Sequence, residues 1–322
     1  MLNNKIKSII INKTEILPNT SSVLNLVKTK LFTNSTIKLP ILIERAALEG
    51  PVVLITAGIH GDEVNGIEIV RQIIDKKINI PKKGTIICIP VLNVIGFTTR
   101  ERYFPDKKDM NRVFPGSKIG SMASRIAYSL TSEVLPFVDL VIDFHTGGES
   151  RYNLPQIRID SNNEKLLELS KIFKSPFIIE SKTIKGSFRN QCKKNNILNL
   201  LYEGGKSNSI SEKISFYGVE GIKRILSSYG MLKDEFKLEP INQEPIFIKK
   251  TRWIRTKYSG LLQIIKNHGS FVEKNDILAR VTDPYGMYNY EIKSLYSGFI
   301  INVNEQALVI EGDAIFNLSV EG

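Results

Sequence analysis

Cysteine is scarce in this sequence, which has only Cys88 and Cys192 among its 322 residues. Cys88 lies inside an apolar run and Cys192 in a polar stretch with helical character, and neither belongs to a CxxC pair. Two isolated cysteines argue against a disulfide framework and against a thiolate metal site. They are typical of a protein from a reducing compartment.

Long hydrophobic runs are lacking as well. No stretch approaches the roughly 20 apolar residues of a membrane span. The apolar run in the N-terminal sequence MLNNKIKSIIINKTE is too short for the core of a signal peptide. We therefore expect a cytoplasmic protein with no membrane partner. Its 42% hydrophobic and 24% charged residues are ordinary for a soluble globular chain of one large domain, or of a large and a small one.

Acidic residues are outnumbered by basic ones, 33 to 44, which gives a formal net charge of +11. Such an excess can indicate binding to nucleic acid or to an anionic surface. The lysines are scattered along the chain, however, and a lysine-rich solvated surface is the favoured interpretation. We expect no nucleic-acid partner, but a positive surface attracts small anionic substrates.

Histidine occurs only three times, and two of the three follow the same pattern. In PVVLITAGIHGDE, residues 51–63, a β-branched run predicts a buried strand that ends in a loop carrying His60 and Glu63. In DLVIDFHTGG, residues 139–148, a similar strand runs into His145. The third, His268, lies in the turn KNHGS and is interpreted as a solvated residue rather than a ligand.

The two strand-end histidines predict a metal site. In an open α/β sheet, ligands gather at the carboxyl ends of the strands, so His60, Glu63 and His145 can converge. Two imidazoles and one carboxylate leave a fourth position for water, which is the pattern of a catalytic rather than a structural zinc site. The alternative for His60 is a loop histidine with a water partner.

Alternating apolar patterns predict an α/β fold with a mixed, largely parallel sheet flanked by helices. Besides the two strands above, strands are predicted at residues 37–45, 85–91, 177–180 and 197–202, and helices at residues 63–77, 121–135, 163–173, 186–196 and 211–226. Pro40 makes the strand at 37–45 an edge or bulged strand, and the turn at 48–50 predicts a hairpin with the strand at 52–56. Residues 1–35 receive no assignment.

A second, smaller unit is predicted at the C-terminal end. The chain becomes polar and proline-containing near Asp234, and short strands with regularly spaced glycines follow. This pattern predicts a small all-β barrel. We therefore expect a catalytic α/β domain at residues 1–240 and a β-barrel domain at residues 241–322.

Glu203 is the candidate general base. It follows the predicted strand at 197–202, as the histidines follow theirs, and two glycines beside it permit close approach. Water that attacks an amide needs a group that takes its proton and returns it to the leaving amine. The alternative is a strand-end glutamate in a salt bridge.

The long segment at residues 93–120 holds candidate substrate residues. Its aromatic side chains favour an ordered, functional loop. A developing oxyanion gains from a second cation, and a substrate carboxylate suits a bidentate guanidinium. Arg102, Asn111 and Arg112 lie on this segment within reach of the strand ends and are candidates for these contacts. Surface arginines of a basic protein are the alternative.

Taken together, the motifs GIHGDE, RYF with DMNRVFPG, VIDFHTGG and LLYEGG resemble the succinylglutamate desuccinylase/aspartoacylase family. These zinc enzymes are related to the metallocarboxypeptidases, and the resemblance covers roughly residues 35–320. The compact β-rich tail is more similar to the bacterial N-acetyl-diaminobutyrate deacetylase-like branch than to the animal aspartoacylases. The tail also resembles a lipoyl-type barrel, but its hairpin DPYGMYN has no lysine, so no carrier role is predicted.

The resemblance implies a role for each motif residue. It implies zinc ligands at His60, Glu63 and His145, a base and acid at Glu203, carbonyl polarisation by Arg102 or alternatively Arg100, carboxylate binding by Asn111 and Arg112, and a substrate-side arginine at Arg189. Asp143 lies two residues before His145, on the same face of a strand, and is expected to orient that imidazole.

We therefore predict a zinc-dependent amidohydrolase that acts on a small N-acyl amino acid. A metallocarboxypeptidase acting on short peptides shares every catalytic residue named and stays open as an alternative. A basic binding protein with a relict zinc site is the alternative from another class. A homo-oligomer is also left open.

Overall fold

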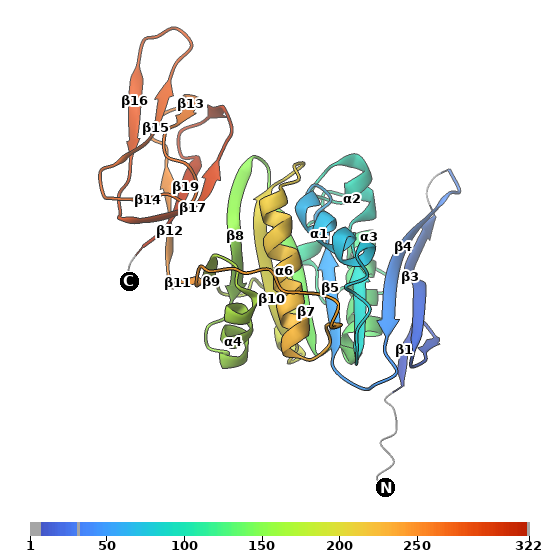
Figure 1. Ribbon diagram of the computed structural model, residues 1–322. Helices are drawn as coiled ribbons and strands as arrows, with labels where there is room; N and C mark the ends of the chain where they lie inside the picture. The colour runs from blue at the N-terminus through green and yellow to red at the C-terminus, as the bar shows by residue number, and fades with distance from the viewer. Residues whose placement is uncertain (1–7, 31–32, 321–322) are drawn as a thin grey trace.

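One large mixed β-sheet dominates the computed structural model, which describes residues 8–30 and 33–320 (Figure 1). In spatial order, its strands are β12 (Thr251–Arg255), β19 (Ala314–Ser319), β17 (Gly298–Asn304), β8 (Arg151–Ile159), β10 (Leu198–Lys206), β7 (Leu140–Gly147), β5 (Val52–Ala57), β6 (Thr85–Ile89), β4 (Thr36–Arg45) and β3 (Thr20–Lys30). The central strands β10, β7, β5 and β6 are parallel, and β8 and β4 flank them in antiparallel orientation. The predicted mixed α/β fold is confirmed.

Helices cover both faces of this sheet. The helices α1 (Val64–Asp75), α4 (Glu164–Phe173) and α6 (Glu212–Ser228) pack on one face, and α3 (Met122–Ser129), the π-helical turn η2 (Leu130–Val134) and α5 (Phe188–Lys194) pack on the other. In β5, Val53 and Ile55 belong to the apolar core beneath α1, α4 and α6, whereas Val52 and Leu54 belong to the core beneath α3, η2 and α5. A parallel strand buried on both faces needs apolar residues at every position, which explains the continuous apolar run in the sequence.

Strand register brings the candidate site residues to one edge of the sheet. Glu203 on β10 is paired with His145 on β7, and Asp143 on β7 is paired with Thr56 on β5. The strands are parallel, so their carboxyl ends and the loops that follow lie together.

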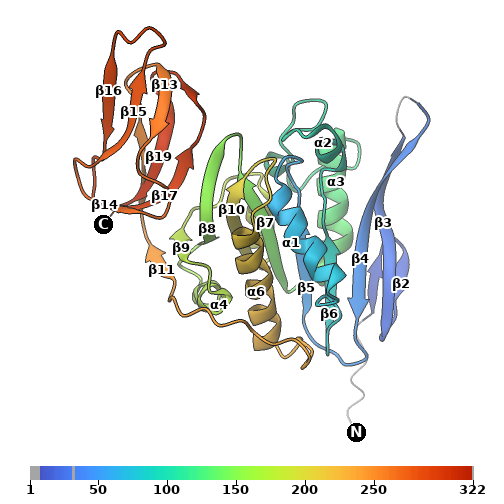
Figure 2. The same ribbon diagram turned by 45° about the horizontal axis from the view of Figure 1, so that its top comes forward.

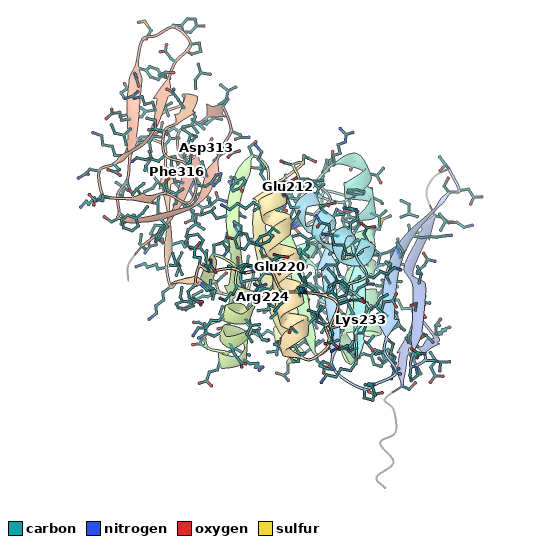
Figure 3. All side chains as sticks on the ribbon, in the orientation of Figure 1. Glu212, Glu220, Arg224, Lys233, Asp313 and Phe316 are labelled. Atoms are coloured by element: carbon teal, nitrogen blue, oxygen red, sulfur yellow. The ribbon has the colours of Figure 1, made fainter. Side chains whose placement is uncertain are left out.

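The C-terminal strands form two antiparallel layers. The strands β12, β19 and β17 carry the short β14 (Phe271–Val272), and a second sheet contains β16 (Asn289–Lys293), β15 (Ile277–Thr282), β13 (Gly260–Ile264) and β18 (Leu308–Val309). Apolar side chains from both layers, Phe316 among them, form their own core (Figure 3). This unit continues the main sheet, because β17 pairs with β8 and β11 (Ile246–Ile248) pairs with β9 (Phe177–Glu180). The two domains at residues 1–240 and 241–322 remain a proposal.

A buried ion-pair group holds the segment that leads to the C-terminal unit. Glu220 on α6 forms ion pairs with Lys223 and Arg224 at 2.6 and 3.0 Å. Its carboxylate also accepts the backbone N–H of Glu239, and Arg224 donates to the Glu239 carbonyl. Figure 3 shows Glu220 and Arg224 on α6, and Figure 2 shows the C-terminal unit and the β3–β4 pair at opposite ends of the sheet.

The predicted hairpin between residues 37–45 and 52–56 is wrong. Strand β4 pairs with β3 and β6, and β6 lies between β4 and β5. Helix α1 connects β5 to β6, which pairs with β5 in parallel. Strand β6 therefore occupies the side of β5 where β4 was expected. Pro40 lies opposite a bulge between Asn25 and Val27, in a part of β4 that pairs only with β3.

Other differences concern elements without a simple pattern. Strand β8 was not predicted, because Pro155, Gln156 and Arg158 interrupt its apolar residues. Within the unassigned N-terminal region lie β1 (Ile9–Ile11), β2 (Thr14–Ile16) and β3. Residues 1–7, which belong to the N-terminal run discussed above, lie outside the described residues. Among residues 8–30 and 33–320, no helix combines the length and the apolar character needed to cross a membrane.

Candidate active site

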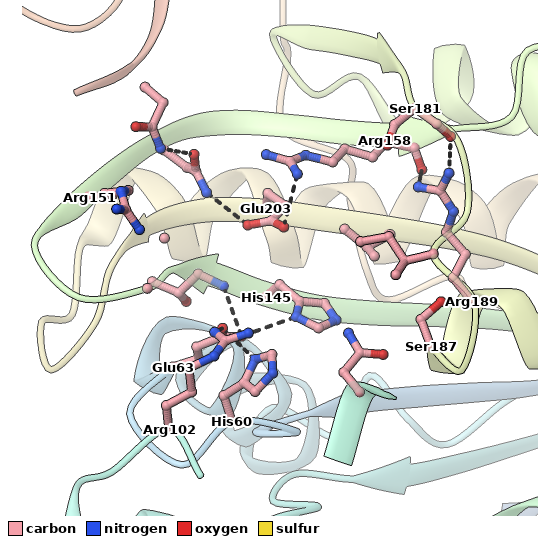
Figure 4. Close-up of a pocket in the computed structure, with 18 of the residues that line it drawn as sticks. His60, Glu63, Arg102, His145, Arg151, Arg158, Ser181, Ser187, Arg189 and Glu203 are labelled. Atoms are coloured by element: carbon pink, nitrogen blue, oxygen red, sulfur yellow. Dashed lines mark hydrogen bonds and ion pairs between the residues drawn. The ribbon is translucent and has the colours of Figure 1, made fainter. Parts of the chain in front are cut away.

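His60, Glu63 and His145 form a buried group in which one potential ligand atom from each residue lies within 4.8 Å of the other two (Figure 4). His60 and Glu63 lie in the loop between β5 and α1, and His145 lies near the end of β7. The two oxygens of Glu63 contact different rings, with Oε1 at 2.6 Å from Nδ1 of His60 and Oε2 at 3.1 Å from Nδ1 of His145. This group can hold a metal ion.

Gly61 allows this loop to take its path. A Cβ added at residue 61 would lie 1.9 Å from the backbone carbon of Gly96, at the turn of helix α2 (Val94–Thr99). The HGDE stretch therefore packs directly on the backbone of α2, and only glycine fits between its histidine and its acidic residues.

Each imidazole is oriented by a second carboxylate. Nε2 of His145 lies 2.8 Å from Oδ2 of Asp143, and Nε2 of His60 lies 3.0 Å from Oδ1 of Asp109. Thr56 donates to the other oxygen of Asp143 at 2.7 Å and fixes that carboxylate in turn. Because a carboxylate accepts a hydrogen bond, the ring proton belongs on Nε2, and the lone pair of Nδ1 is left for a metal.

The electrostatics of the group favour a positive charge at its centre. Burial lowers the pKa of His145, but the carboxylates of Asp143 and Glu63 outweigh this and hold it well above its usual value. Burial likewise raises the pKa of Glu63, but the two imidazoles outweigh this and hold it well below its usual range. A metal cation bound between these groups would be stabilised by the same carboxylates.

Arg102 lies on the loop between α2 and the short helix η1 (Met110–Arg112), and it lines the pocket. Its guanidinium donates to Oε1 of Glu63 and to Oδ2 of Asp109, both at 3.2 Å. Arg100, the alternative to Arg102, is exposed at the end of α2 and is not among the described residues that line the pocket. Of the two arginines, Arg102 is the one that reaches the site.

Asn111 and Arg112 follow Asp109 and also line the pocket. The side-chain oxygen of Asn111 accepts the backbone N–H of Phe188 at 2.8 Å, so its amide nitrogen is the end available to a ligand. Arg112 is exposed and donates to the Asn111 carbonyl at 2.7 Å. Asp109 caps this turn by accepting the backbone N–H of Asn111 at 2.8 Å.

Glu203 lines the same pocket from β10. Its Oε2 accepts a hydrogen bond from the side chain of Asn153 at 2.8 Å, and its Oε1 lies 3.6 Å from a guanidinium nitrogen of Arg158. Both partners come from β8, the antiparallel neighbour of β10. Figure 4 shows Glu203 on the strand next to the one that carries His145.

The pocket has a volume of about 260 Å³ and a cationic lining. Among the described residues that line it, the basic side chains are Arg102, Arg112, Arg151, Arg158, Lys182 and Arg189, and the acidic ones are Glu63 and Glu203. Arg189, on α5, donates to the backbone carbonyls of Arg158 and Ser181. Burial, together with the charge of Arg158, lowers the pKa of Arg189 to about 10.

Sequence reasoning missed several residues of this pocket. No role is predicted for Asp109 from the sequence, although its spacing in DMNR places it one turn before Arg112. Asn153, Arg158, Trp253 and Asn302 carry no motif, and only the strand order brings them to Glu203. His268 was expected to be a solvated turn residue, but it is half-buried and stacks on Tyr152 with ring centres 3.9 Å apart.

A family model described as the succinylglutamate desuccinylase/aspartoacylase catalytic domain matches residues 49–229, more than half of the chain. The chain belongs to the succinylglutamate desuccinylase/aspartoacylase family. The resemblance predicted from the motifs is therefore confirmed. Members of this family are N-acyl amino acid deacylases, so the protein is placed among deacylating hydrolases.

Among curated relatives, the chain is similar to the N-alpha-acetyl-L-2,4-diaminobutyric acid deacetylase of Halomonas elongata. The two are 27% identical over 281 residues, which cover 83% of this chain and 81% of the relative. Among solved structures, the product-bound ectoine utilization protein of Ruegeria pomeroyi superposes with a TM-score of 0.83 at 23% identity, over 94% of this chain and 95% of that one. A succinylglutamate desuccinylase from a Silicibacter species gives 0.83 at 20% identity and covers 99% of both chains. The two structures establish the shared fold.

Proposed function

We propose that this protein is a zinc-dependent amidohydrolase that cleaves the amide bond of an N-acyl amino acid and releases a carboxylate and a free amino acid. One observation carries the proposal. A single pocket contains the His60–Glu63–His145 group, a carboxylate at Glu203 and the Asn111–Arg112 pair.

The metal-binding group fits zinc. Two imidazole nitrogens and one carboxylate oxygen are a common donor set of catalytic zinc sites, which keep one position open. Asp109 and Asp143 hold His60 and His145 in the tautomer that a zinc ligand requires. When bound, zinc supplies Lewis acidity toward a carbonyl oxygen and toward water.

Glu203 acts as the proton carrier. It accepts a proton from the attacking water and delivers it to the leaving amine. Asn153 and Arg158 hold its carboxylate from the β8 side. The position of Glu203 beside His145 in the strand register places it next to the metal-binding group.

Arg102 is proposed to stabilise the oxygen of the scissile carbonyl. Its guanidinium already lies 3.2 Å from Glu63, beside the expected metal position. Negative charge develops on the carbonyl oxygen during attack, and a fixed cation at that point lowers the barrier. Asp109 anchors the other nitrogen of Arg102 and limits its movement.

Asn111 and Arg112 are proposed to bind the substrate carboxylate. A guanidinium offers two parallel donors to a planar carboxylate, and the free amide end of Asn111 adds a third. The excess of basic side chains around the pocket supports an anionic substrate. Arg189, whose charge is disfavoured by burial and by Arg158, gains most from such an anion.

The test is a turnover screen of N-acetyl and N-succinyl amino acids, including N-acetyl-L-aspartate and N-alpha-acetyl-L-2,4-diaminobutyrate. We expect hydrolysis by the purified enzyme, loss of activity after chelation, and recovery when zinc is added back. Dipeptides with free amino groups are the control. Faster hydrolysis of dipeptides than of N-acyl amino acids would favour a carboxypeptidase and overturn the substrate assignment.

A complete lack of turnover would favour the relict-site alternative, in particular if salt-sensitive nucleic-acid binding appeared instead. The proposal also includes a cytoplasmic location, which is supported by the two unpaired, buried cysteines. The number of subunits is not part of it.

A further inference from the structure

The C-terminal unit contributes to the wall of the pocket through Asn302. Strand β17 pairs with β8 so that Asn302 lies opposite Asn153, and Asn153 in turn lies opposite Gly205 on β10. The side-chain nitrogen of Asn302 donates to the side-chain oxygen of Asn153. The nitrogen of Asn153 then donates to Oε2 of Glu203 at 2.8 Å. A chain of two amides thus joins the C-terminal unit to the proposed base.

The series of hydrogen bonds from Asn302 through Asn153 to Glu203 has a defined donor-to-acceptor direction. An amide side chain has a donor end and an acceptor end, and Asn302 occupies the acceptor end of Asn153. The donor end of Asn153 therefore faces the carboxylate of Glu203. Asn153 and Asn302 are only 3% and 6% exposed, so water is a poor substitute for either partner. If the amide of Asn153 rotated by half a turn, its oxygen would face a carboxylate oxygen and repel it.

The backbone around Asn302 is firmly held. Its neighbours Ile301 and Val303 are 1% and 2% exposed and belong to two different apolar clusters. On the other side of β17, Asn302 is paired with Asn317 on β19. The placement of Asn302 against Asn153 is therefore fixed by the fold of the C-terminal unit.

We propose that Asn302 is a positioning residue for Glu203, which it orients through Asn153, so that the C-terminal unit completes the active site. The inference rests on the proposed function, because it takes Glu203 as the proton carrier. Asn302 acts without contacting the reacting atoms.

The first test replaces Asn302 by residues that reverse or remove its hydrogen bond to Asn153. Asn302→Asp has nearly the same shape but only accepts hydrogen bonds, so it attracts the donor end of Asn153 away from Glu203. We expect kcat to fall about 10- to 100-fold, the usual effect of removing an outer-shell orienting partner. The KM is expected to stay within about 2-fold of wild type, since the Asn111–Arg112 pair is unchanged. Asn302→Ala removes the partner without reversing the amide and is expected to lower kcat less.

Asn304→Asp is the matched control. Asn304 lies on the same strand, is also buried, and accepts the backbone N–H of Gln306, which an aspartate can still do. We expect its kcat to match that of wild type. Zinc content and thermal unfolding are measured for every variant. An equal fall in kcat for Asn302→Asp and Asn304→Asp would overturn the proposal.

A double-mutant cycle tests whether Asn302 acts through Asn153. The Asn153→Ala/Asn302→Asp variant is expected to be no slower than Asn153→Ala alone. If the fall in kcat of the double variant equals the product of the two single falls, Asn302 acts independently of Asn153 and the proposal is wrong. Should Asn302→Asp fail to fold, Asn302→Ala replaces it in the same cycle with the same expectation.

A measurement without turnover separates this inference from the proposed function. The side-chain NH2 signals of Asn153 in ¹⁵N NMR, assigned by their loss in Asn153→Ala, are expected to shift in both Asn302→Ala and Glu203→Gln. Unchanged signals in both variants would overturn the amide chain whatever the activity. Near-normal turnover by Glu203→Gln would instead contradict the proposed function, while shifted NMR signals would still support the chain.

Discussion

The two walls of the pocket are built in different ways. The metal-binding wall takes His60 and Glu63 from the loop that follows β5 and His145 from β7, and β5 and β7 are adjacent parallel strands of the central sheet. In the Glu203 wall, Glu203 is hydrogen-bonded to Asn153, 50 residues earlier in the chain, and Asn153 is hydrogen-bonded to Asn302, 149 residues after Asn153. The metal-binding wall comes from the central sheet and its loops, whereas the Glu203 wall includes Asn302 from the C-terminal unit.

This difference means that substitutions in the two walls should have separable effects. Changes in the first wall should remove metal and activity together. Changes in the second wall should leave the metal in place and affect the rate. Substitutions in each wall, with zinc content and turnover measured on the same samples, test that separation.

The largest effect is expected for His145→Ala. Wild type should bind about one zinc ion per chain, and the variant should lose both zinc and activity, because a catalytic site needs its three protein ligands. Metal analysis of the purified proteins measures this. His268→Ala is the control, since it also removes one of three histidines, and it should retain zinc. Full zinc occupancy in His145→Ala would refute the ligand assignment.

Arg102→Ala is expected to lower kcat by two to three orders of magnitude, roughly the effect of removing one oxyanion-stabilising donor. Zinc should remain bound, because Arg102 is not a ligand. The exposed Arg100 offers a matched comparison on the same loop, and Arg100→Ala should behave as wild type. If the two variants lose equal activity, Arg102 has no special role.

Arg112→Ala is expected to lower kcat/KM about 10- to 100-fold, which corresponds to about 1.5–3 kcal/mol, the order for a hydrogen bond to a charged group. Arg112→Lys should also be impaired, because it keeps the charge but loses the planar fork. Methyl esters of the substrate should be poor for wild type and should show little further loss in the variant. Equal losses for esters and free acids would show that Arg112 does not bind the carboxylate.

The smallest effect is expected in the pH dependence of the free energy of unfolding after metal removal. Burial lowers the pKa of His60 and His145, but neighbouring carboxylates outweigh this and raise both above 6.5. In metal-free protein, the protonated His60 and His145 contribute to the free energy of unfolding. This contribution is fully present below about pH 6.5 and is lost as pH rises through the pKa values of the folded state. Zinc replaces these protons, so the zinc-loaded form should not show this loss, and zinc affinity should rise with pH.

Denaturant unfolding of both forms between about pH 6 and pH 9 measures this difference. A metal-free form with constant stability over that range would contradict the charge balance described for the site.

The contrast between the walls also explains what could be predicted from the sequence. His60, Glu63 and His145 were predicted because each follows a strand whose apolar run is visible, and parallel strands end at one edge. Asp143 was predicted because residues two apart on a strand share a face, and the structure shows the expected contact with His145. These inferences need only local pattern and a general rule of topology.

The remainder needed information that local patterns lack. The apolar period of a strand does not identify its neighbour, so β4 was paired with β5 instead of β6. Asp109 reaches His60 only because the loop folds back over the strand ends. Asn153 and Asn302 are ordinary strand asparagines until β8 and β17 pair beside β10.

Glu203 is proposed to move protons at a zinc site that binds N-acyl amino acids. The zinc-loaded Glu203→Gln variant tests this role without changing a metal ligand. Trp253 lines the pocket and is the only tryptophan in the sequence, so its fluorescence reports substrate binding independently of turnover. We predict unchanged zinc, near-normal binding and a fall in kcat of roughly two to four orders of magnitude, the range for general acid–base catalysis. A near-normal kcat in this zinc-loaded variant would contradict the account.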